Sequence, residues 1–456
     1  MLKIILAFFL IIVFINLKAQ NNDSLLIKKI YNEALSDNTA IENLRYLTKK
    51  IGGRICGSPQ AAAAVEWSKQ LMQTMGLDTV YLQKMNVVNW KRGEPEIGTI
   101  TSTIFGTLNI SICALGTSVG TGVDGIVGEV IEVRSMDELK NLGEKQIKGK
   151  IVFFNRPMDP THITTFEAYG GAADQRVIGA SEAAKYGAIA VIIRSLTLSN
   201  DEFPHTGVMH YYDGINKIPA VAICTKHADI LSKWLKTDSK LKMFIRTTCQ
   251  FYEEAESYNV IGEIKGSVYP NEIITIGGHL DCWDNSEGAH DDGAGCIQAI
   301  EVLRILKKLN IKPKHTIRAV MFMDEEIAQR GAKKYAELVK LNNEKHLVAI
   351  ESDRGANTPV GFSIDAENSK FNEILKFKNY FELYHMHDFI KDGSGVDIGP
   401  LKEFNIPLIA LVPESQRYFE YHHCANDTFE NINKRELQLG SAAIAALVYL
   451  IDYHGL

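Results

Sequence analysis

The second half of the chain alternates short apolar runs with longer segments in which apolar residues recur at helical spacing. Runs of about four to eight mostly apolar residues between polar turns predict buried strands, and an apolar period of about 3.6 residues predicts amphipathic helices. Strands separated by such helices form a mainly parallel sheet covered on both faces. The expected strands are 272–277, 316–323, 347–351 and 408–412, and the expected helices are 294–309, 332–341 and 435–453.

The first half of the chain shows two further patterns. Residues 22–52 form a polar segment with helical spacing, and residues 61–75 form an amphipathic helix pattern that is followed by a strand. Between residues 122 and 244 short strands again alternate with helices, but no cluster of histidines and acids follows those strands. We therefore expect a separate module at 122–244, within a discontinuous domain made of residues 20–121 and 245–456.

The N-terminus differs in kind from the rest of the chain. Lys3 precedes an almost unbroken apolar run from Ile4 to Ile15, and the small residue Ala19 ends the segment. This arrangement predicts a secretory signal peptide over residues 1–19. A transmembrane helix needs about 20 apolar residues, so an uncleaved membrane anchor is the less favoured alternative. The mature protein is expected to be secreted or periplasmic, without membrane contact.

Composition narrows the class of protein and of partner. The chain has 456 residues, of which 46% are hydrophobic and 23% charged, as is typical of a soluble globular protein with about two or three domains. The formal net charge of −6 and the lack of a basic cluster argue against nucleic acid as a partner. The 7 cysteines show no CxxC spacing, and their odd number leaves at least one thiol free, although export permits disulfides.

Histidines and carboxylates recur at the ends of the expected strands. His279 and Asp281 lie two residues apart, so both face the same side of an extended segment. The ordinary alternatives are a surface pair for these two residues, a helix N-cap for Asp291, and a solvated acidic turn for Glu325 and Glu326. Adjacent carboxylates repel each other unless a cation or proton separates them, so one of the two glutamates could bind a metal while the other accepts a proton.

Two more elements complete this set. Asp353 follows the strand expected at 347–351, and the pair His422-His423 stands near the C-terminus, where a core or surface role is the usual alternative. Imidazole and carboxylate, without thiolate, are the ligands of hydrolytic zinc sites. Together the elements supply about two histidines and three or four carboxylates. That inventory suits two metals that share a bridging aspartate and activate water for attack on a carbonyl.

At these residues the chain resembles the di-zinc exopeptidase family that includes bacterial secreted aminopeptidases and glutamate carboxypeptidase. The resemblance covers nearly the whole mature chain and rests on an ordered set of motifs: Trp90-Lys91-Arg92-Gly93-Glu94, Thr206 to Pro219, Gly277-Gly278-His279-Leu280-Asp281, Asp291-Asp292-Gly293-Ala294-Gly295, Glu325-Glu326, Glu351-Ser352-Asp353 and His422-His423. It implies an α/β/α sandwich with a central mixed, mainly parallel sheet. It also implies that 122–244 is an inserted protease-associated domain, which caps the cleft and limits access to short peptides.

The resemblance implies a role for each candidate residue. Two zinc ions per chain are expected, and their implied ligands are His279 and Asp353 for one ion, Glu326 and His423 for the other, and Asp291 for both. Glu325 is the implied general base, and Asp281 is implied to orient the imidazole of His279. A homodimer is also expected from the resemblance.

Further details follow from the same resemblance. His423 is preferred to His422 as the ligand because the family has a His-x-x-x-Asp-Thr pattern, in which the acid here is Asp427. A loop that contains Gly395 and Asp397 is expected to contact substrate, because glycine lets the backbone approach a peptide terminus. An ordinary flexible loop is the alternative.

Cys282 departs from the family pattern, in which serine or another small polar residue follows His-Leu-Asp. Cys424 directly follows the expected ligand His423. Because each cysteine neighbours a different expected ligand, a disulfide or thiol pair between Cys282 and Cys424 is a hypothesis. A Cα–Cα separation well beyond about 7 Å would exclude the disulfide.

The expected activity is hydrolysis of dipeptides or short peptides by a secreted di-zinc exopeptidase of the carboxypeptidase or dipeptidase type. An aminopeptidase that acts on longer peptides could use the same metals. A receptor-like relative without metals and a one-zinc enzyme related to glutaminyl cyclase share the implied architecture. The complete ligand set disfavours the receptor, and the inserted module disfavours the cyclase.

Overall fold

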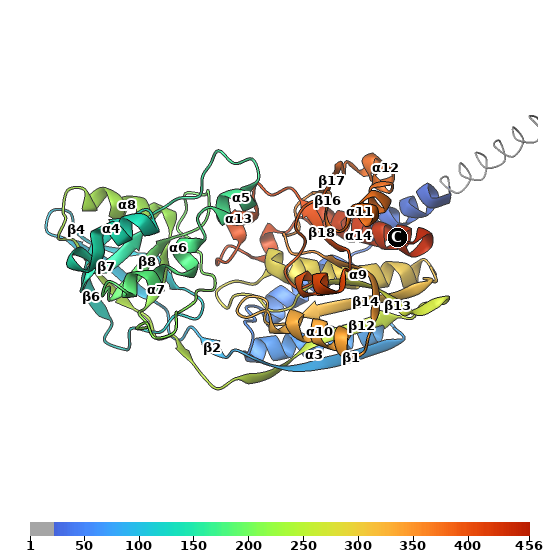
Figure 1. Ribbon diagram of the computed structural model, residues 1–456, viewed down its shortest axis with the longest axis horizontal. Helices are drawn as coiled ribbons and strands as arrows, with labels where there is room; N and C mark the ends of the chain where they lie inside the picture. Colours follow the sequence, from blue (N-terminus) through green and yellow to red (C-terminus); the bar gives the residue numbers. More distant parts are fainter. Residues whose placement is uncertain (1–21) are drawn as a thin grey trace, which may run out of the picture.

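A computed structural model describes residues 22–456, which form two lobes side by side (Figure 1). Each lobe is built around an 8-stranded sheet. The chain crosses between the lobes where β2 (Trp90–Lys91) pairs with β11 (Gln250–Phe251). We call residues 22–91 and 250–456 the first lobe, and residues 92–249 the second lobe. The expected signal peptide, residues 1–19, lies outside the described residues.

The sheet of the first lobe has the strand order β1-β12-β14-β13-β15-β18-β16-β17. Its four central strands, from β14 to β18, run parallel, whereas β12 and β16 are antiparallel to their inner neighbours. The expectation of an α/β fold with a mixed sheet is therefore confirmed. The strands are β1 (Thr79–Val87), β12 (Ala255–Ile264), β13 (Tyr269–His279), β14 (His315–Phe322), β15 (Lys345–Glu351), β16 (Pro359–Asp365), β17 (Asp388–Ile390) and β18 (Leu408–Pro413).

Helices cover both faces of this sheet. On one face α3 (Pro59–Thr74), α9 (Ala294–Lys308) and α14 (Lys434–His454) share a single apolar core with the strands. On the other face α10 (Arg330–Leu341) and η4 (Gly399–Phe404) pack against β14 and neighbouring strands. Every residue of β14 is buried, because it is covered on both faces.

The remaining helices of the first lobe lie around this core. Helix α14 is long and apolar enough to cross a membrane by length and composition, but 83% of its most apolar window is buried inside the fold, as in a core helix. Residues 22–36 are helical. They are followed by α2 (Thr39–Tyr46) and η1 (Leu47–Ile51), and the shorter helices are η2 (Ala289–Gly293), α11 (Asn368–Leu375), α12 (Lys378–Phe381), η3 (Glu382–Tyr384), α13 (Tyr418–Tyr421) and η5 (Phe429–Asn431).

The sheet of the second lobe has the order β4-β3-β10-β6-β7-β8-β9-β5. Strands β6 to β9 run parallel, and the flanking strands are antiparallel. The strands are β3 (Ile97–Ser102), β4 (Gly106–Ile110), β5 (Ile112–Ala114), β6 (Ile126–Val133), β7 (Ile151–Phe154), β8 (Ala190–Arg194), β9 (Ala220–Ile223) and β10 (Lys242–Arg246). The helices are α4 (Met136–Ile147), α5 (Thr165–Gly170), α6 (Asp174–Val177), α7 (Gly179–Ala184) and α8 (Thr225–Leu235).

The second sheet begins earlier in the sequence than the expected module boundary at residue 122. Strands β3, β4 and β5, within residues 97–114, belong to it. This segment is rich in threonine and has no long apolar run, so its periodicity alone did not indicate strands. Pairing of β3 with β10 and of β5 with β9 draws the segment into the second lobe.

Candidate metal centre

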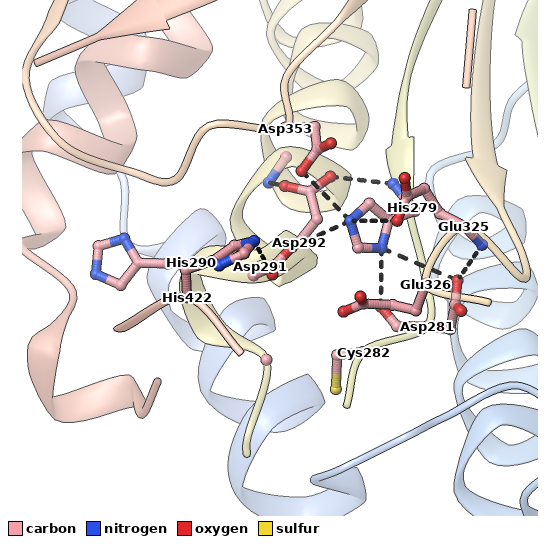
Figure 2. A network of polar contacts seen from close by, with 12 residues as sticks. His279, Asp281, Cys282, His290, Asp291, Asp292, Glu325, Glu326, Asp353 and His422 are labelled. Atoms are coloured by element: carbon pink, nitrogen blue, oxygen red, sulfur yellow. Dashed lines mark hydrogen bonds and ion pairs between the residues drawn. The ribbon is translucent and has the colours of Figure 1, made fainter. Parts of the chain in front are cut away.

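The expected ligands meet at the carboxyl end of the central strands. His279 is the last residue of β13, Glu325 and Glu326 follow β14, and Asp353 follows β15. Parallel neighbouring strands end at the same edge of a sheet, so these side chains converge although they are distant in sequence. Asp291 joins them from η2, before α9, and Figure 2 shows it with Asp353 and Glu325 around the ring of His279.

Asp291 lies between two sets of potential ligand atoms. Its Oδ1 is 3.2 Å from Nε2 of His279, and its Oδ2 is 3.3 Å from Nε2 of His423. On one side Asp353 Oδ1 is 3.3 Å from His279 Nε2, and on the other Glu326 Oε2 is 3.2 Å from His423 Nε2. Ligands about 2.0–2.1 Å from a tetrahedral zinc are about 3.3 Å from one another, so both sets have suitable spacing.

The chemistry of these donors fits zinc. Oδ2 of Asp291 and Oε1 of Glu326 are buried without a hydrogen-bond partner among the described residues. A buried carboxylate oxygen without a partner is costly, and a cation relieves that cost. Imidazole nitrogens and carboxylate oxygens are the usual donors of catalytic zinc sites. The two histidines and three carboxylates therefore form a donor set able to hold zinc.

The pKa values reflect the concentration of negative charge. Burial raises the pKa of Glu325 and of Glu326 well above their usual range. The charges of Asp353 and Asp291 add to the increase at Glu325, and that of Asp291 adds to it at Glu326. Burial lowers the pKa of His423 well below its usual value, so this imidazole is neutral. The neutral imidazole is the form that binds a metal, and a divalent cation would reduce the repulsion among the carboxylates.

Asp281 orients its neighbours through two different groups. Its main-chain oxygen accepts a hydrogen bond from Nδ1 of His279 at 3.0 Å, which turns Nε2 towards Asp291 and Asp353. Its carboxylate is 3.9 Å from that Nδ1 and accepts a hydrogen bond from the backbone N–H of Glu325 at 3.2 Å. That Asp281 orients His279 stays a prediction, and the structure adds that the main-chain oxygen makes the hydrogen bond while the carboxylate holds the backbone of Glu325.

Two other carboxylates hold backbone N–H groups. Asp292 accepts hydrogen bonds from the N–H of His279 at 3.0 Å and from the first turn of α9 at 3.1 Å. Asp427 accepts from the N–H of His290 at 2.7 Å and of Asp291 at 3.1 Å. The sequence pattern contained Asp427 only as a marker for the ligand histidine, whereas the structure shows that it fixes the backbone of the residue between the two ligand sets.

The paired histidines differ in their geometry. His423 Nε2 is 3.2–3.3 Å from two carboxylates, but His422 Nε2 approaches only Asp291, at 3.9 Å. The two rings stack with their centroids 3.5 Å apart. His422 also packs edge-on against Tyr169 of the second lobe. The geometry therefore favours His423 as the ligand.

Comparison with known proteins places this site in a family. Residues 259–448 match the model of peptidase family M28. Carboxypeptidase Q of Mus musculus is 31% identical over 91% of this chain and 86% of its own length, and that of Homo sapiens is 31% identical over 92% and 86%. The chain belongs to peptidase family M28. This confirms the expected class, a metallopeptidase hydrolase, and the resemblance seen in the motifs.

Solved structures agree with the M28 assignment. A peptidase M28 precursor from Shewanella amazonensis superimposes with a TM-score of 0.90 at 31% identity, covering 95% of this chain and 97% of that one. A zinc aminopeptidase from Bacillus subtilis has the same fold, with a TM-score of 0.65 at 22% identity over 90% of this chain and 94% of that one. The similarity to both structures extends over both lobes.

A cavity of about 700 Å³ lies over the candidate metal centre. The first lobe contributes the carboxylates of the site, including Glu325 and Asp353, together with Tyr418 and Phe419. No residue of the second lobe that lines the cavity was singled out as a site residue from the sequence, because contacts between segments so far apart leave no local pattern. These residues are Thr117, Phe166, Tyr169, Arg176, Val208, Met209, His210, Tyr211 and Lys217.

Arg176 is the most unusual of these cavity residues. It lies in α6, is only 6% exposed, and its Nε has no hydrogen-bond partner among the described residues. Its guanidinium carbon is 5.3 Å from the centroid of the Tyr169 ring. A Cβ built on Gly207 would contact both Arg176 Nη1 and His423 Nδ1, which places the guanidinium beside that histidine. Within the described residues no carboxylate lies within 4.0 Å of the guanidinium.

The expected substrate loop contains Gly395 and Asp397. Asp397 is fully buried, and burial together with the charge of Glu351 raises its pKa well above the usual range. Gly395 packs directly against the Glu351 carboxylate, since a Cβ there would lie 2.2 Å from its carboxyl carbon. Val396, between them, lines the cavity. That this loop contacts substrate stays a prediction: Val396 is its residue that lines the cavity, Gly395 is half-buried, and the Asp397 side chain is buried.

The cysteine hypothesis is not supported. All 7 cysteines are buried and free. The sulfur of Cys282 accepts a hydrogen bond from the backbone N–H of Arg54 at 3.4 Å, and the thiol of Cys424 donates to the main-chain oxygen of Tyr421 at 3.2 Å. The two residues are therefore not joined by a disulfide, and each sulfur has a different partner.

Sequence reasoning also missed the support that Arg54 gives to the site. Arg54 is fully buried. Its guanidinium donates hydrogen bonds to the main-chain oxygens of Leu280, Glu287 and Gly288. These oxygens belong to the loop that connects His279 to the turn carrying Asp291. The only local signal beside Arg54 is the pair Gly52-Gly53, which is typical of a loop and does not indicate a buried arginine.

Proposed function

We propose that the chain is a di-zinc exopeptidase that hydrolyses dipeptides or short peptides with a free C-terminal carboxylate. The observation that carries this proposal is the position of Asp291, whose two oxygens each face a separate imidazole–carboxylate pair at 3.2–3.3 Å. A bridging carboxylate between two such pairs is the arrangement that two-metal hydrolases use to activate water. Membership of peptidase family M28 supports the proposal that the scissile bond is a peptide bond.

The proposed ligands divide into two sets around Asp291. His279 and Asp353 would hold one zinc ion, Glu326 and His423 the other, and Asp291 both. When bound, the ions would polarise the scissile carbonyl and make a nearby water more acidic.

Glu325 is the proposed general base. It lines the cavity, its side chain is 16% exposed, and its Oε2 is 4.0 Å from Nε2 of His279. Burial raises its pKa, which strengthens it as a proton acceptor. It would take a proton from the attacking water and return it to the leaving amine. Asp281 would keep Glu325 in position through the bond to its backbone N–H.

Replacement of Glu325 tests this function. The variant Glu325→Gln should retain both zinc ions, because Glu325 is not among the proposed ligands, and lose about 10²–10⁴-fold in kcat as the base is removed. The matched control is Glu337→Gln on the exposed face of α10, which should leave kcat unchanged. Zinc is counted by metal analysis and turnover by dipeptide hydrolysis. Near-normal turnover of Glu325→Gln would reject the proposed mechanism.

Arg176 favours a substrate with a free C-terminus. A guanidinium binds a carboxylate with two parallel hydrogen bonds, and this one has no carboxylate partner within the described residues. An aminopeptidase needs an acceptor for the substrate's ammonium group. Four carboxylates line the cavity, and all are assigned to the zinc site as ligands or as the general base, so none is left to bind an ammonium group. They are Asp291, Glu325, Glu326 and Asp353. An aminopeptidase with the same metals is the second candidate.

The second lobe is proposed to be a protease-associated domain that restricts substrate length. Its residues Phe166, Tyr169 and Tyr211 contribute walls to the cavity over the metal centre. A series of peptides of increasing length with one scissile bond tests this role. The rate should fall steeply as residues are added, and equal rates for a dipeptide and an octapeptide would reject it. Export and dimerisation, expected from the sequence and the family resemblance, remain part of the proposal.

A further inference from the structure

We propose that the second lobe positions one of the zinc ligands, through hydrogen bonds from His205 and Thr206 to the main chain of His422 and His423. We call these two hydrogen bonds the interlobe clamp. The inference rests on the proposed role of His423 as a ligand. It adds that the first lobe does not hold this ligand by itself.

The clamp engages two consecutive main-chain oxygens. Nδ1 of His205 is 2.7 Å from the main-chain oxygen of His422, and the backbone N–H of Thr206 donates to that of His423 at 2.9 Å. Because a carbonyl oxygen only accepts, Nδ1 of His205 must carry the proton. The donors and acceptors are separated by 217 residues in sequence and belong to different lobes.

The backbone of His423 needs external support. Its φ is 63°, in the left-handed region, which is costly for a residue with a side chain and persists where the surroundings enforce it. This conformation directs Nε2 to within 3.3 Å of Asp291 and Glu326. The hydrogen bonds to the peptide carbonyls before and after the Cα of His423 restrict the rotation that would withdraw the imidazole from those carboxylates.

The clamp residues are themselves rigidly held. The backbone N–H of His205 donates to Oγ of Ser195 at 2.8 Å, and that hydroxyl donates to the main-chain oxygen of Ile223, at the end of β9, at 2.8 Å. Oγ1 of Thr206 donates to the main-chain oxygen of Ala114 in β5 at 2.8 Å. The clamp is therefore fixed to two strands of the second sheet, and not to a loop that could follow the movement of the ligand.

The residues around the clamp are closely packed, and the polar groups of the clamp are shielded from water. His205 is 3% exposed, and its Nε2 has no hydrogen-bond partner within the described residues, so the bond from Nδ1 to His422 is the ring's one hydrogen bond there. Gly207 has φ +133°, and a Cβ there would lie 2.7 Å from Nδ1 of His423. A side chain at position 207 would thus displace the ligand, which explains glycine at this point.

The consequence is a difference between the two proposed zinc sites. The site with His423 needs the lobes to be in contact, whereas His279 and Asp353 come directly from neighbouring strands of one sheet. Supports of ligand residues change metal affinity by about 10–100-fold. The two effects are thermodynamically linked: if the clamp favours the geometry that binds zinc, then zinc binding must in turn stabilise the hydrogen bonds of the clamp.

A pair of variants with side chains of similar size tests the clamp. His205→Asn keeps an N–H donor near the position of Nδ1, and His205→Leu removes it. Zinc affinity is measured by chelator competition on the purified full chain. We expect His205→Leu to bind one of its two zinc ions about 10–100-fold more weakly, and His205→Asn to stay close to the wild type. His227→Leu, in α8 of the same lobe, is the matched control and should bind both ions normally.

A measurement on the unmutated protein covers the case in which a variant does not fold. Amide hydrogen exchange of the segment containing Thr206 should slow when zinc is added to the chelated protein, because its N–H donates to His423. Equal exchange with and without zinc, or equal zinc binding by folded His205→Leu and the wild type, would overturn the clamp. If the wild type binds no zinc at all, the proposed function fails instead.

Discussion

Replacement of Arg176 by methionine separates the two candidate activities. Methionine keeps a side chain of similar reach and packing against Tyr169 but removes the charge and all N–H donors. If Arg176 binds the substrate's terminal carboxylate, the variant should lose activity on peptides with a free C-terminus. Peptides that end in an amide do not make that ion pair, so their hydrolysis should be little affected.

The magnitude follows from the burial of the guanidinium. Arg176 is 6% exposed and lies over the metal centre, where water does not compete fully for the carboxylate. A hydrogen bond to a charged group contributes about 1.5–3 kcal/mol, and truncation of one partner of a buried charge pair costs about 2–5 kcal/mol. A loss of about 3 kcal/mol corresponds to about a 150-fold decrease in kcat/KM. Arg176→Lys should recover part of this loss, because it restores the positive charge. The recovery should be incomplete, because an ammonium group lacks the planar pair of donors of a guanidinium.

The assay compares kcat/KM for one dipeptide as free acid and as C-terminal amide. The wild type should prefer the acid, and Arg176→Met should abolish the preference by slowing only the acid. Lys217→Met is the matched control, since Lys217 also lines the cavity but stacks over Tyr211, and it should keep the preference. An equal loss on both substrates, or no loss on the acid, would refute carboxylate recognition by Arg176 and favour the aminopeptidase.

Three further results are expected. His423→Ala should lower bound zinc from two ions to one by metal analysis, whereas His422→Ala, at 3.9 Å from Asp291, should retain two; equal loss in both would contradict the ligand assignment. Arg54→Met should decrease the free energy of unfolding in urea by about 3 kcal/mol or more, because buried oxygens lose their donors, against less than about 1 kcal/mol for exposed Arg45→Met. Burial raises the pKa of Glu301 from 4.5 to about 7, so the folded state binds more protons than the unfolded state and its stability falls as pH rises across that window. The stability of the wild type relative to Glu301→Gln should therefore decrease by up to about 3 kcal/mol between these pH values, and a constant difference would contradict the shift.

The strands, and the convergence of the candidate ligands at their ends, could be predicted because their signals are local. The apolar run Ile273–Ile276 is buried on both faces, and the polar residues that follow it can only lie at the sheet edge. The same reasoning located Glu325, Glu326 and Asp353. The local rule failed where a residue's environment comes from a distant segment. Arg176 has no motif around it, and its position at the cavity appears only in the folded structure.

The contacts of Asp281 and Asp397 could not be predicted from the sequence, for a similar physical reason. Sequence spacing shows which residues are near each other, but it does not show whether a side chain or a main-chain group makes the contact. At Asp281 the backbone oxygen lies closer to the imidazole than the carboxylate does. At Asp397 the glycine at position 395 allows the loop to fold inward onto Glu351, and so buries the carboxylate that a flexible loop would have exposed.

The two ligand sets look equivalent in the sequence, but their supports differ. His279 ends a central strand, its Nδ1 is bonded to the neighbouring main chain, and its N–H is held by a buried carboxylate. His423 lies in a loop with a left-handed backbone, and the groups that hold its carbonyl and that of His422 come from the second lobe. Separation of the lobes would therefore leave the supports of His279 intact and remove those of the His422 and His423 carbonyls. With His423 as the proposed ligand, we expect loss of the contact between the lobes to weaken zinc binding at the site with His423 and to leave the site with His279 unchanged.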